Sequence, residues 1–319
     1  MDVGELVDRV PRGDRRAVAR AISLVENTAP QLREIMAGLA AHTGRARVVG
    51  LTGSPGVGKS TSTSALVRVL RDRGSSVAVL AVDPSSPFSG GALLGDRVRM
   101  QEHATDSGVF IRSMASRGHL GGLSWAAPHA LRVLDAAGFD TVLVETVGVG
   151  QAEVDIAGHA DTTVVLCAPG MGDSVQAAKA GVLEIADILV VNKADREGAR
   201  TAARELRQMV AQVDRGPEEW KPPVVSTVAA KGEGVGELLE RIDQHGSYLR
   251  GSGGLDSRRH ARARQEVEAI VVGALRDRMG TVHGHADLDA LAGDVAAARI
   301  DPYTAADRLL RALDRSAPK

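Results

Sequence analysis

One segment of the chain combines glycines, a lysine and a serine at a spacing that suits phosphate binding. It reads Gly53-Ser54-Pro55-Gly56-Val57-Gly58-Lys59-Ser60-Thr61, and its first eight residues match G-x-x-x-x-G-K-[ST] in full. The mainly apolar run Val48–Thr52 precedes it and a helical pattern follows. Backbone N–H groups of such a loop point at a polyphosphate, and the helix N-terminus adds partial positive charge. The sequence therefore predicts that residues 53–61 hold the phosphates of a nucleotide.

Two side chains of this loop have expected roles of their own. Lys59 would bridge the terminal phosphates, and the hydroxyl of Ser60 would coordinate Mg²⁺. The alternative is a chance glycine turn. The order of strand, loop and helix argues against that alternative, because the motif needs this context to work.

A second motif, Asn192-Lys193-Ala194-Asp195, ends the run Ile188–Asn192. The Asp195 carboxylate can accept hydrogen bonds from both N1–H and the 2-amino group of guanine, a donor pair that adenine lacks. Alone the tetrapeptide is ambiguous, since Asn and Asp also form turns at strand ends. Next to a phosphate loop it favours GTP over ATP.

A further contribution to the base pocket is expected after the run Pro223–Thr227. The sequence there continues to Lys231-Gly232-Glu233-Gly234. In GTPases the residues just before such a Gly-x-Gly contact the base edge through backbone amides. We therefore include Val228, Ala229 and Ala230 among the nucleotide-binding candidates.

The run Thr141–Glu145 ends in Glu145-Thr146-Val147-Gly148, where GTPases usually carry Asp-x-x-Gly. The acid is expected to contact magnesium and the Gly148 amide to meet the γ-phosphate; Glu145 supplies the same charge on a longer side chain. Val149 follows, where Ras-like proteins have the Gln that orients water. We therefore expect GTP hydrolysis to be slow without a partner.

Two aspartates are candidates for magnesium or for the attacking water. Asp83 ends the run Val77–Val82, and Asp96 follows thirteen residues later. The alternative for each is a helix or turn cap. The segment between them is rich in Gly, Pro and Ser, which suits a loop that orders around a γ-phosphate.

Seven short, largely apolar runs must position these motifs. They are Val48–Thr52, Val77–Val82, Val109–Ser113, Thr141–Glu145, Thr163–Cys167, Ile188–Asn192 and Pro223–Thr227. Such runs suit a sheet covered on both faces, and the helical stretches between them are long enough for right-handed crossovers. The predicted fold class is α/β: a P-loop NTPase with a doubly wound, mainly parallel sheet and helices on both faces.

Helical patterns flank this domain on both sides. Residues 1–44 are expected to form an N-terminal helical extension, 45–250 the GTPase domain and 251–319 a C-terminal helical dimerisation arm. Residues 251–254 suggest a flexible joint. A basic cluster follows this joint, with Arg258, Arg259, His260, Arg262 and Arg264. It suggests a solvated helix face or, alternatively, a phosphate or coenzyme contact. An apolar stripe behind the cluster indicates subunit contact. The stripe consists of Val267, Ile270, Val271, Ala274 and Leu275.

Composition excludes several classes of partner. The 319 residues hold 39 basic and 40 acidic side chains, so no basic field favours nucleic acid or an anionic membrane, and the 2% aromatics make base-stacking platforms unexpected. The single cysteine, Cys167, excludes an internal disulfide framework or a cysteine zinc site. No run approaches the roughly 18 apolar residues of a membrane span. We expect a cytoplasmic protein.

These motifs together resemble the MeaB/ArgK (MMAA-like) family of P-loop GTPases over nearly the whole chain. The most specific stretches are Asp83–Met100, Arg112–Leu123 and Glu145–Glu153. The resemblance implies GTP or GDP with Mg²⁺ as cofactors and a homodimer built through C-terminal helices. It also implies a chaperone that gates cobalamin loading and protects or reactivates an adenosylcobalamin-dependent acyl-CoA mutase, chiefly methylmalonyl-CoA mutase.

The resemblance also implies roles for individual residues. Those that fall on the family's phosphate, magnesium and acidic positions are Lys59, Ser60, Asp83, Asp96 and Glu145. Gln176 and Lys179 fall on a switch that answers to the partner, although Lys179 could equally be a solvated helix lysine. The family usually has Ser where Val228 stands, so a hydroxyl contact to the base is lost and some ATP use stays open.

Two other functions are alternatives to this one: nickel delivery and phosphorylation of a small molecule. A nickel-delivery GTPase would need a histidine tract or cysteine site, but the histidines are scattered and only His283 and His285 are close in sequence. A small-molecule kinase, such as an amino-acid transport kinase, gains nothing from the guanine selectivity that Asp195 implies. Phosphorylation of added amino acids would discriminate the kinase from the GTPase.

Overall fold

The computed structural model describes residues 1–83, 100–103, 105–115, 126–146, 158–170, 183–279 and 286–316. The chain divides into two compact units, Met1–Arg259 and His260–Lys319. This division falls inside the helix α12 (Gly254–Met279) rather than after residue 250. The joint expected at 251–254 is a short turn, because α11 (Val235–Gly251) runs through Gly251 and α12 begins at Gly254.

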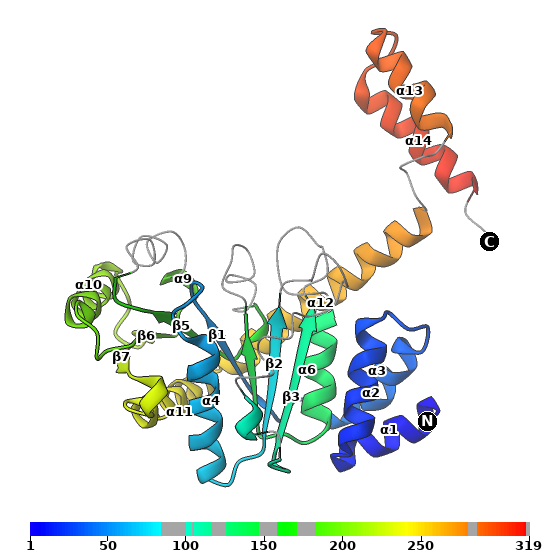
Figure 1. The fold of residues 1–319 in the computed structure, drawn as a ribbon. Coiled ribbons are helices and arrows are strands. Elements are labelled where there is room, and N and C mark those ends of the chain that lie inside the picture. Colours follow the sequence, from blue (N-terminus) through cyan, green and yellow to red (C-terminus); the bar gives the residue numbers. More distant parts are fainter. Residues whose placement is uncertain are drawn as a thin grey trace. The chain divides into compact units, whose positions relative to one another are not determined.

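The first unit is built on a seven-stranded sheet (Figure 1). All of its pairings are parallel and the strand order is β3-β2-β4-β1-β5-β6-β7. This confirms the predicted doubly wound fold, and each expected run is a strand within two residues at either end. The strands are β1 (Arg47–Thr52), β2 (Val77–Asp83), β3 (Val109–Ala115), β4 (Thr141–Glu145), β5 (Thr162–Cys167), β6 (Ile188–Asn192) and β7 (Val224–Thr227).

Both faces of the sheet are buried, which explains why the strands are apolar throughout rather than alternating with polar residues. On β5, Val164 joins the core on one face while its neighbours Val165 and Cys167 join the core on the other. The cysteine is therefore a buried strand residue, 3% exposed. The carboxyl ends of all seven strands lie at one edge of the sheet, and the candidate site residues stand at or just after these strand ends.

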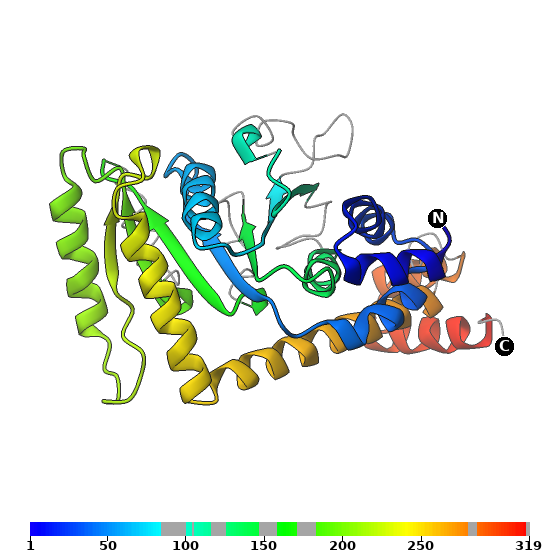
Figure 2. The same cartoon turned by 90° about the horizontal axis from the view of Figure 1, so that it is seen from below.

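Helices cover the two faces in separate groups. The helices α4 (Lys59–Asp72) and α11 pack on one face, with residues such as Leu66 and Leu239 in its core. On the other face α6 (Ala126–Ala136) covers β1, β2 and β4, and α10 (Ala199–Gln212) covers β5 and β6. Seen from below, α10 and the N-terminal helices stand at opposite ends of the sheet (Figure 2).

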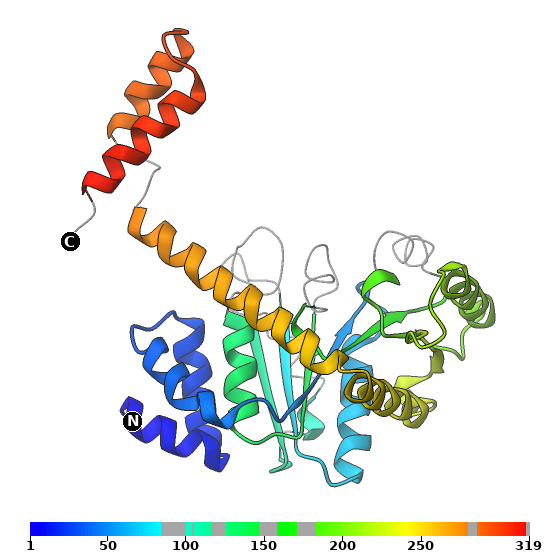
Figure 3. The ribbon, with the colours of Figure 1, turned by 180° about the vertical axis from the view of Figure 1, so that it is seen from behind.

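The N-terminal extension belongs to the same core as the sheet. Its helices are α1 (Val3–Arg9), α2 (Arg15–Glu26) and α3 (Leu32–Leu39), and they lie beside α6 (Figure 3). Asp2 and Asp14 cap the first two, each accepting a backbone N–H from the first turn. Ile22 and Ile35 are fully buried in the core that also holds Leu134 of α6. These helices therefore bury their apolar faces against the domain that carries the sheet.

Short helices complete the described chain: η1 (Val10–Arg12), η2 (Ala40–His42), η3 (Gln101–His103), α9 (Leu183–Ile185) and η5 (Ala229–Lys231). The second unit contains most of α12 with α13 (Ala286–Ala296) and α14 (Pro302–Ser316). Leu309 and Leu313 of α14 are buried, whereas Val267, Val271 and Leu275 of α12 are each at least half exposed. Within the described residues no helix is both long and apolar enough to span a membrane.

The two outer strands of the sheet are protected in different ways. At β3, the Arg15 guanidinium donates to the Val109 carbonyl at 2.5 Å and lies 5.7 Å from the centre of the Phe110 ring. At β7, two prolines, Pro222 and Pro223, stand immediately before the first residue of the strand. Unpaired strand edges are where sheets of different molecules join, and both devices oppose such joining.

Ion pairs close the amino edge of the sheet, opposite the predicted site. Arg258 makes a two-pronged contact with Asp187 at 2.7 and 2.8 Å, and Nε2 of His245 lies 3.3 Å from the same carboxylate. Arg259 reaches Asp161 at 3.3 Å. The sequence suggested a solvated face, or a phosphate or coenzyme contact, for these two arginines. Both suggestions are wrong for Arg258 and Arg259, which hold the start of α12 against β5 and β6.

The Asp187 carboxyl is 9% exposed. Burial by itself would raise its pKa, but the contacts from His245 and Arg258 outweigh burial and hold the pKa below the ordinary 3.8. Because the Asp187 carboxyl has a lower pKa in the folded state than in the unfolded state, it stabilises the folded state at pH values above the unfolded pKa. That stabilisation is lost as the pH falls through the folded pKa.

Replacing Arg258 by Met should lower the free energy of unfolding by about 2 kcal/mol at neutral pH. A buried carboxylate then loses a partner, and the figure is reduced because Arg258 itself is 39% exposed. Urea unfolding at several pH values measures this. The difference from the parent should shrink below pH 3.8. Arg264→Met, on an exposed residue of the same helix, is the control, and an equal loss in both variants contradicts the assignment.

Candidate nucleotide site

The loop between β1 and α4 adopts a conformation that requires glycine. Gly53, Gly56 and Gly58 have φ angles of 138°, 81° and 96°. A Cβ on Gly53 would lie 2.2 Å from the carbonyl oxygen of Leu166 on β5. A Cβ on Gly58 would lie 2.4 Å from Nδ2 of Asn192 on β6. The glycines of the motif therefore let the loop lie against the ends of two neighbouring strands.

Lys59 opens α4 and its side chain folds back over the loop. Its Nζ donates to the carbonyl oxygens of Gly53 at 2.7 Å and Ser54 at 3.2 Å, and the residue is 8% exposed. The ammonium is thus held by the loop whose N–H groups are expected to face phosphate. Its backbone carbonyl accepts from Thr63, which fixes the first turn of the helix.

Ser60 and Glu145 meet at the centre of the sheet edge. The Ser60 hydroxyl donates to Oε1 of Glu145 at 2.5 Å, and both residues are buried. This contact follows from topology, since β4 lies beside β1 with Leu51 opposite Glu145. A hydroxyl and a carboxylate are hard oxygen ligands of the kind that Mg²⁺ takes. The two residues therefore fit the magnesium site that the sequence predicted.

Of the other two acidic candidates, Asp83 and Asp96, only Asp83 lies within the described residues. Asp83 is the last residue of β2, the neighbour of β4 on its other side, and Ala81 pairs with Glu145. Its backbone therefore reaches the same sheet edge. The remaining candidates lie outside the described residues: Asp96, Gly148, Gln176 and Lys179.

Asn192 connects three parts of the site. Its Nδ2 donates to the Val57 carbonyl of the phosphate loop at 2.8 Å. Its Oδ1 accepts from the Thr227 hydroxyl and from the Ala229 backbone N–H, each at 3.1 Å. The residue is 3% exposed, so these bonds form in a buried environment. One amide side chain thus joins the ends of β6 and β7 to the phosphate loop.

Lys193 adds a second link to the loop. It has a positive φ of 58°, unusual for a residue with a side chain, and its Nζ donates to the Gly56 carbonyl at 2.6 Å. Asp195, two residues on, has its Oδ2 3.2 Å from Nζ of Lys231. No motif in the sequence predicts that ion pair, although Lys231 begins the segment Lys231-Gly232-Glu233-Gly234.

The loop after β7 is joined to the end of β6. Val228 pairs with Glu233 in a backbone bridge, and η5 begins at Ala229. The Ala229 N–H, a candidate for contact with the base, donates to Oδ1 of Asn192 at 3.1 Å. Its role in this structure is to join the loop to β6, while the exposed Ala230 follows it in η5.

Residues 18–283 match the family described as methylmalonyl Co-A mutase-associated GTPase MeaB. The chain belongs to the MeaB family. A putative GTPase of Pyrococcus abyssi is 49% identical over 311 residues, which is 97% of this chain and 96% of that protein. Membership confirms the resemblance seen in the sequence and makes this chain a P-loop GTPase, which binds GTP and GDP and hydrolyses GTP.

Two further relatives extend the comparison. A mouse protein described as methylmalonic aciduria type A homolog, mitochondrial, is 32% identical over 328 residues, 97% of this chain and 79% of that protein. The crystal structure titled LAO/AO transport system kinase superposes with a TM-score of 0.75 and 26% identity, covering 98% of this chain and 97% of that one. Family and fold therefore agree over nearly the whole length.

Lys59→Ala should abolish GTP hydrolysis or nucleotide binding while the fold survives. The Lys59 ammonium donates to the loop carbonyls of Gly53 and Ser54, so removing it leaves the apolar core intact. Phosphate release, fluorescent GDP binding and thermal unfolding measure the three quantities. The control is Lys221→Ala, on an exposed lysine remote from the loop. Hydrolysis at the parental rate by Lys59→Ala contradicts the phosphate-loop assignment.

Asp195→Asn should reduce the preference for guanine. The carboxylate can accept both guanine donors, and a charged hydrogen bond is worth about 1.5–3 kcal/mol, or one to two decades in affinity. Calorimetry with GDP and ADP, on the parent and the variant, measures the ratio. Asp214→Asn, at an exposed aspartate, should leave it unchanged. Equal affinity of the parent for GDP and ADP would contradict the proposed guanine selectivity.

Proposed function

We propose that this GTPase is a chaperone of an adenosylcobalamin-dependent acyl-CoA mutase, with methylmalonyl-CoA mutase as the first candidate. In this role GTP hydrolysis gates cobalamin loading and protects or reactivates the mutase. The observation that carries the proposal is the match of residues 18–283 to a family described as mutase-associated. The name of the mouse relative refers to methylmalonic aciduria, which supports methylmalonyl-CoA mutase as the partner.

Within the site, we assign the phosphates to residues 53–61 and the γ-phosphate also to the Gly148 amide. Lys59 then exchanges its loop carbonyls for terminal phosphate oxygens. Asp195 accepts from guanine, with Asn192 and residues 228–230 fixing the surrounding loops. The 2.5 Å contact between Ser60 and Glu145 supports these two as the centre of the metal site.

Magnesium at this position would neutralise part of the phosphate charge. Ser60 and Glu145 would hold the ion, with Asp83 and Asp96 as further acidic residues for the ion or the attacking water. The protein's own contribution is position: α4 fixes Ser60, and β4 fixes Glu145 one strand away. Because Val149 cannot orient water, this arrangement is expected to turn over slowly by itself.

A partner would complete the site through the segment that contains Gln176 and Lys179. It follows β5, which ends at Cys167 beside the phosphate loop, and precedes β6. A lysine brought toward the γ-phosphate would stabilise charge in the transition state. The exposed apolar residues of α12, among them Val267, Val271 and Leu275, support a homodimer through the C-terminal helices.

The cognate mutase should raise the GTPase rate at least about tenfold, some 1.4 kcal/mol of barrier. Lys179→Ala should lose most of this gain and keep the basal rate. Steady-state phosphate release with and without purified methylmalonyl-CoA mutase measures both.

Several outcomes separate the possibilities. An unstimulated parent argues against the chaperone role with that mutase, and normal stimulation of Lys179→Ala refutes only the role given to Lys179. Phosphorylation of added arginine or ornithine would favour a kinase, and tight Ni²⁺ binding would favour nickel delivery.

A further inference from the structure

Two oppositely charged side chains meet where the sequence places the base of the nucleotide. Nζ of Lys231, the last residue of η5, lies 3.2 Å from Oδ2 of Asp195, which stands just after β6. The Lys231 side chain is 57% exposed and the Asp195 side chain is 42% exposed. Ion pairs this exposed contribute little to stability, so stability alone gives little reason for a lysine here.

The backbone segments that carry these two side chains are joined to each other. The Ala194 N–H donates to the Thr227 carbonyl at 3.0 Å, which ties the residue before Asp195 to the end of β7. On the other side, the Lys231 N–H donates to the Val228 carbonyl at 2.8 Å and so closes the turn of η5. The ammonium and the carboxylate therefore extend from one fixed frame, and only the exposed side chains have to move when a base arrives.

Several backbone donors of the loop after β7 are already engaged within the protein. The Val228 N–H donates to the Glu233 carbonyl at 3.0 Å, and Val228 has no side-chain hydroxyl. The Ala229 N–H donates to Oδ1 of Asn192 at 3.1 Å. The Gly232 N–H donates to the Ala229 carbonyl, also at 3.1 Å. An acceptor atom on an approaching base is therefore met more readily by a side-chain donor than by these amides.

Together the two side chains present a hydrogen-bonding pattern that matches guanine. One edge of guanine carries two donors, N1–H and the 2-amino group, next to one acceptor, O6. The Asp195 carboxylate offers two acceptor oxygens, and the Lys231 ammonium beside it offers a donor. Cytosine presents the same order of two acceptors and one donor when it pairs with guanine. Adenine has a 6-amino donor where guanine has O6, so an ammonium at this place disfavours adenine.

We propose that Lys231 is a specificity-determining residue whose ammonium donates to O6 of guanine while Asp195 accepts from N1–H and the 2-amino group. The ammonium has three N–H donors, so it can serve O6 and remain close to the carboxylate. Lysine is a common donor to guanine O6 wherever proteins recognise this base. The inference rests on the proposed guanine role of Asp195 and adds a second contact that distinguishes the two purines.

Lys231→Met removes the ammonium and keeps a side chain of similar length. It should weaken GDP binding by about tenfold, as expected for one charged hydrogen bond, and should not weaken ADP binding. Calorimetry on the nucleotide-free protein measures both affinities. Lys221→Met, on an exposed lysine before β7, at the opposite end of that strand from η5, is the matched control. Parental or tighter GDP binding by Lys231→Met overturns the proposal, because the lysine would then only compete with guanine for Asp195.

A modified nucleotide identifies the atom that Lys231 contacts. In 6-thio-GDP a sulfur, which is a weak acceptor, replaces O6, while N1–H and the 2-amino group remain. The preference of the parent for GDP over 6-thio-GDP should shrink at least about fivefold in Lys231→Met and persist in Lys221→Met. Thermal unfolding without nucleotide should agree for all three proteins, because both lysines are exposed. An equal preference in the parent and Lys231→Met overturns the contact with O6.

Asp195→Asn separates a failure of this inference from a failure of the proposed guanine site. If Asp195→Asn lowers the preference for GDP over ADP and Lys231→Met does not, only the role of Lys231 fails. If Asp195→Asn keeps the parental preference, the guanine role of Asp195 fails and the role of Lys231 fails with it. A lowered preference in both variants, with weaker discrimination against 6-thio-GDP in Lys231→Met, supports the proposal.

Discussion

The candidate site depends on the buried side-chain amide of Asn192. Its donor and acceptor ends are used at once, on the phosphate loop and on the loop after β7, so neither loop can shift without breaking a bond in a dry environment. Gly58 is a glycine for the same reason, since any larger residue would collide with this amide. The loop expected to hold phosphate and the loop expected to approach the base are thereby held in fixed positions relative to each other.

Much of this frame could be predicted from the sequence, because it follows from local patterns. The seven apolar runs, the capping aspartates of α1 and α2, and the loop at Gly53–Ser60 each have a short-range signal. Their meeting at one edge follows from the parallel sheet. The contact of Ser60 with Glu145 was accessible by the same argument, since only strand order was needed to bring them together.

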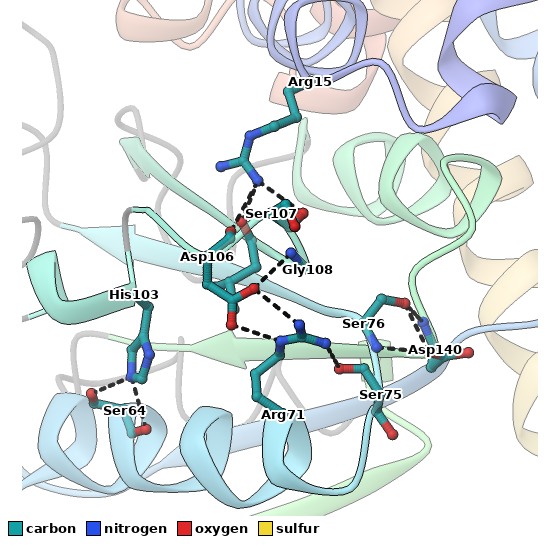
Figure 4. A network of polar contacts seen from close by, with 11 residues as sticks. Arg15, Ser64, Arg71, Ser75, Ser76, His103, Asp106, Ser107, Gly108 and Asp140 are labelled. Carbon is teal, nitrogen blue, oxygen red and sulfur yellow. Dashed lines mark hydrogen bonds and ion pairs between the residues drawn. The ribbon is translucent and has the colours of Figure 1, made fainter.

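Other contacts had no such signal. Arg258 and Arg259 look like a solvated basic cluster in sequence, and their acidic partners lie more than seventy residues away. The pairing of Ser64 with His103 (Figure 4) depends on how residues 100–103 return to α4, which no periodicity encodes. The Ala229 N–H is another example, because its partner is chosen by the packing of β6 against β7. A single sequence carries no local signal for polar contacts between residues that lie far apart along the chain.

The protected edges of the sheet have a consequence for the life of the protein in concentrated solution. Arg15 occupies a carbonyl oxygen at the start of β3, and the prolines before β7 cannot donate a backbone hydrogen bond. Strand-by-strand growth into fibrils is therefore opposed at both ends of the sheet. Contacts with other molecules are thereby directed to the helices, which can expose apolar surface without offering a strand edge for sheet growth.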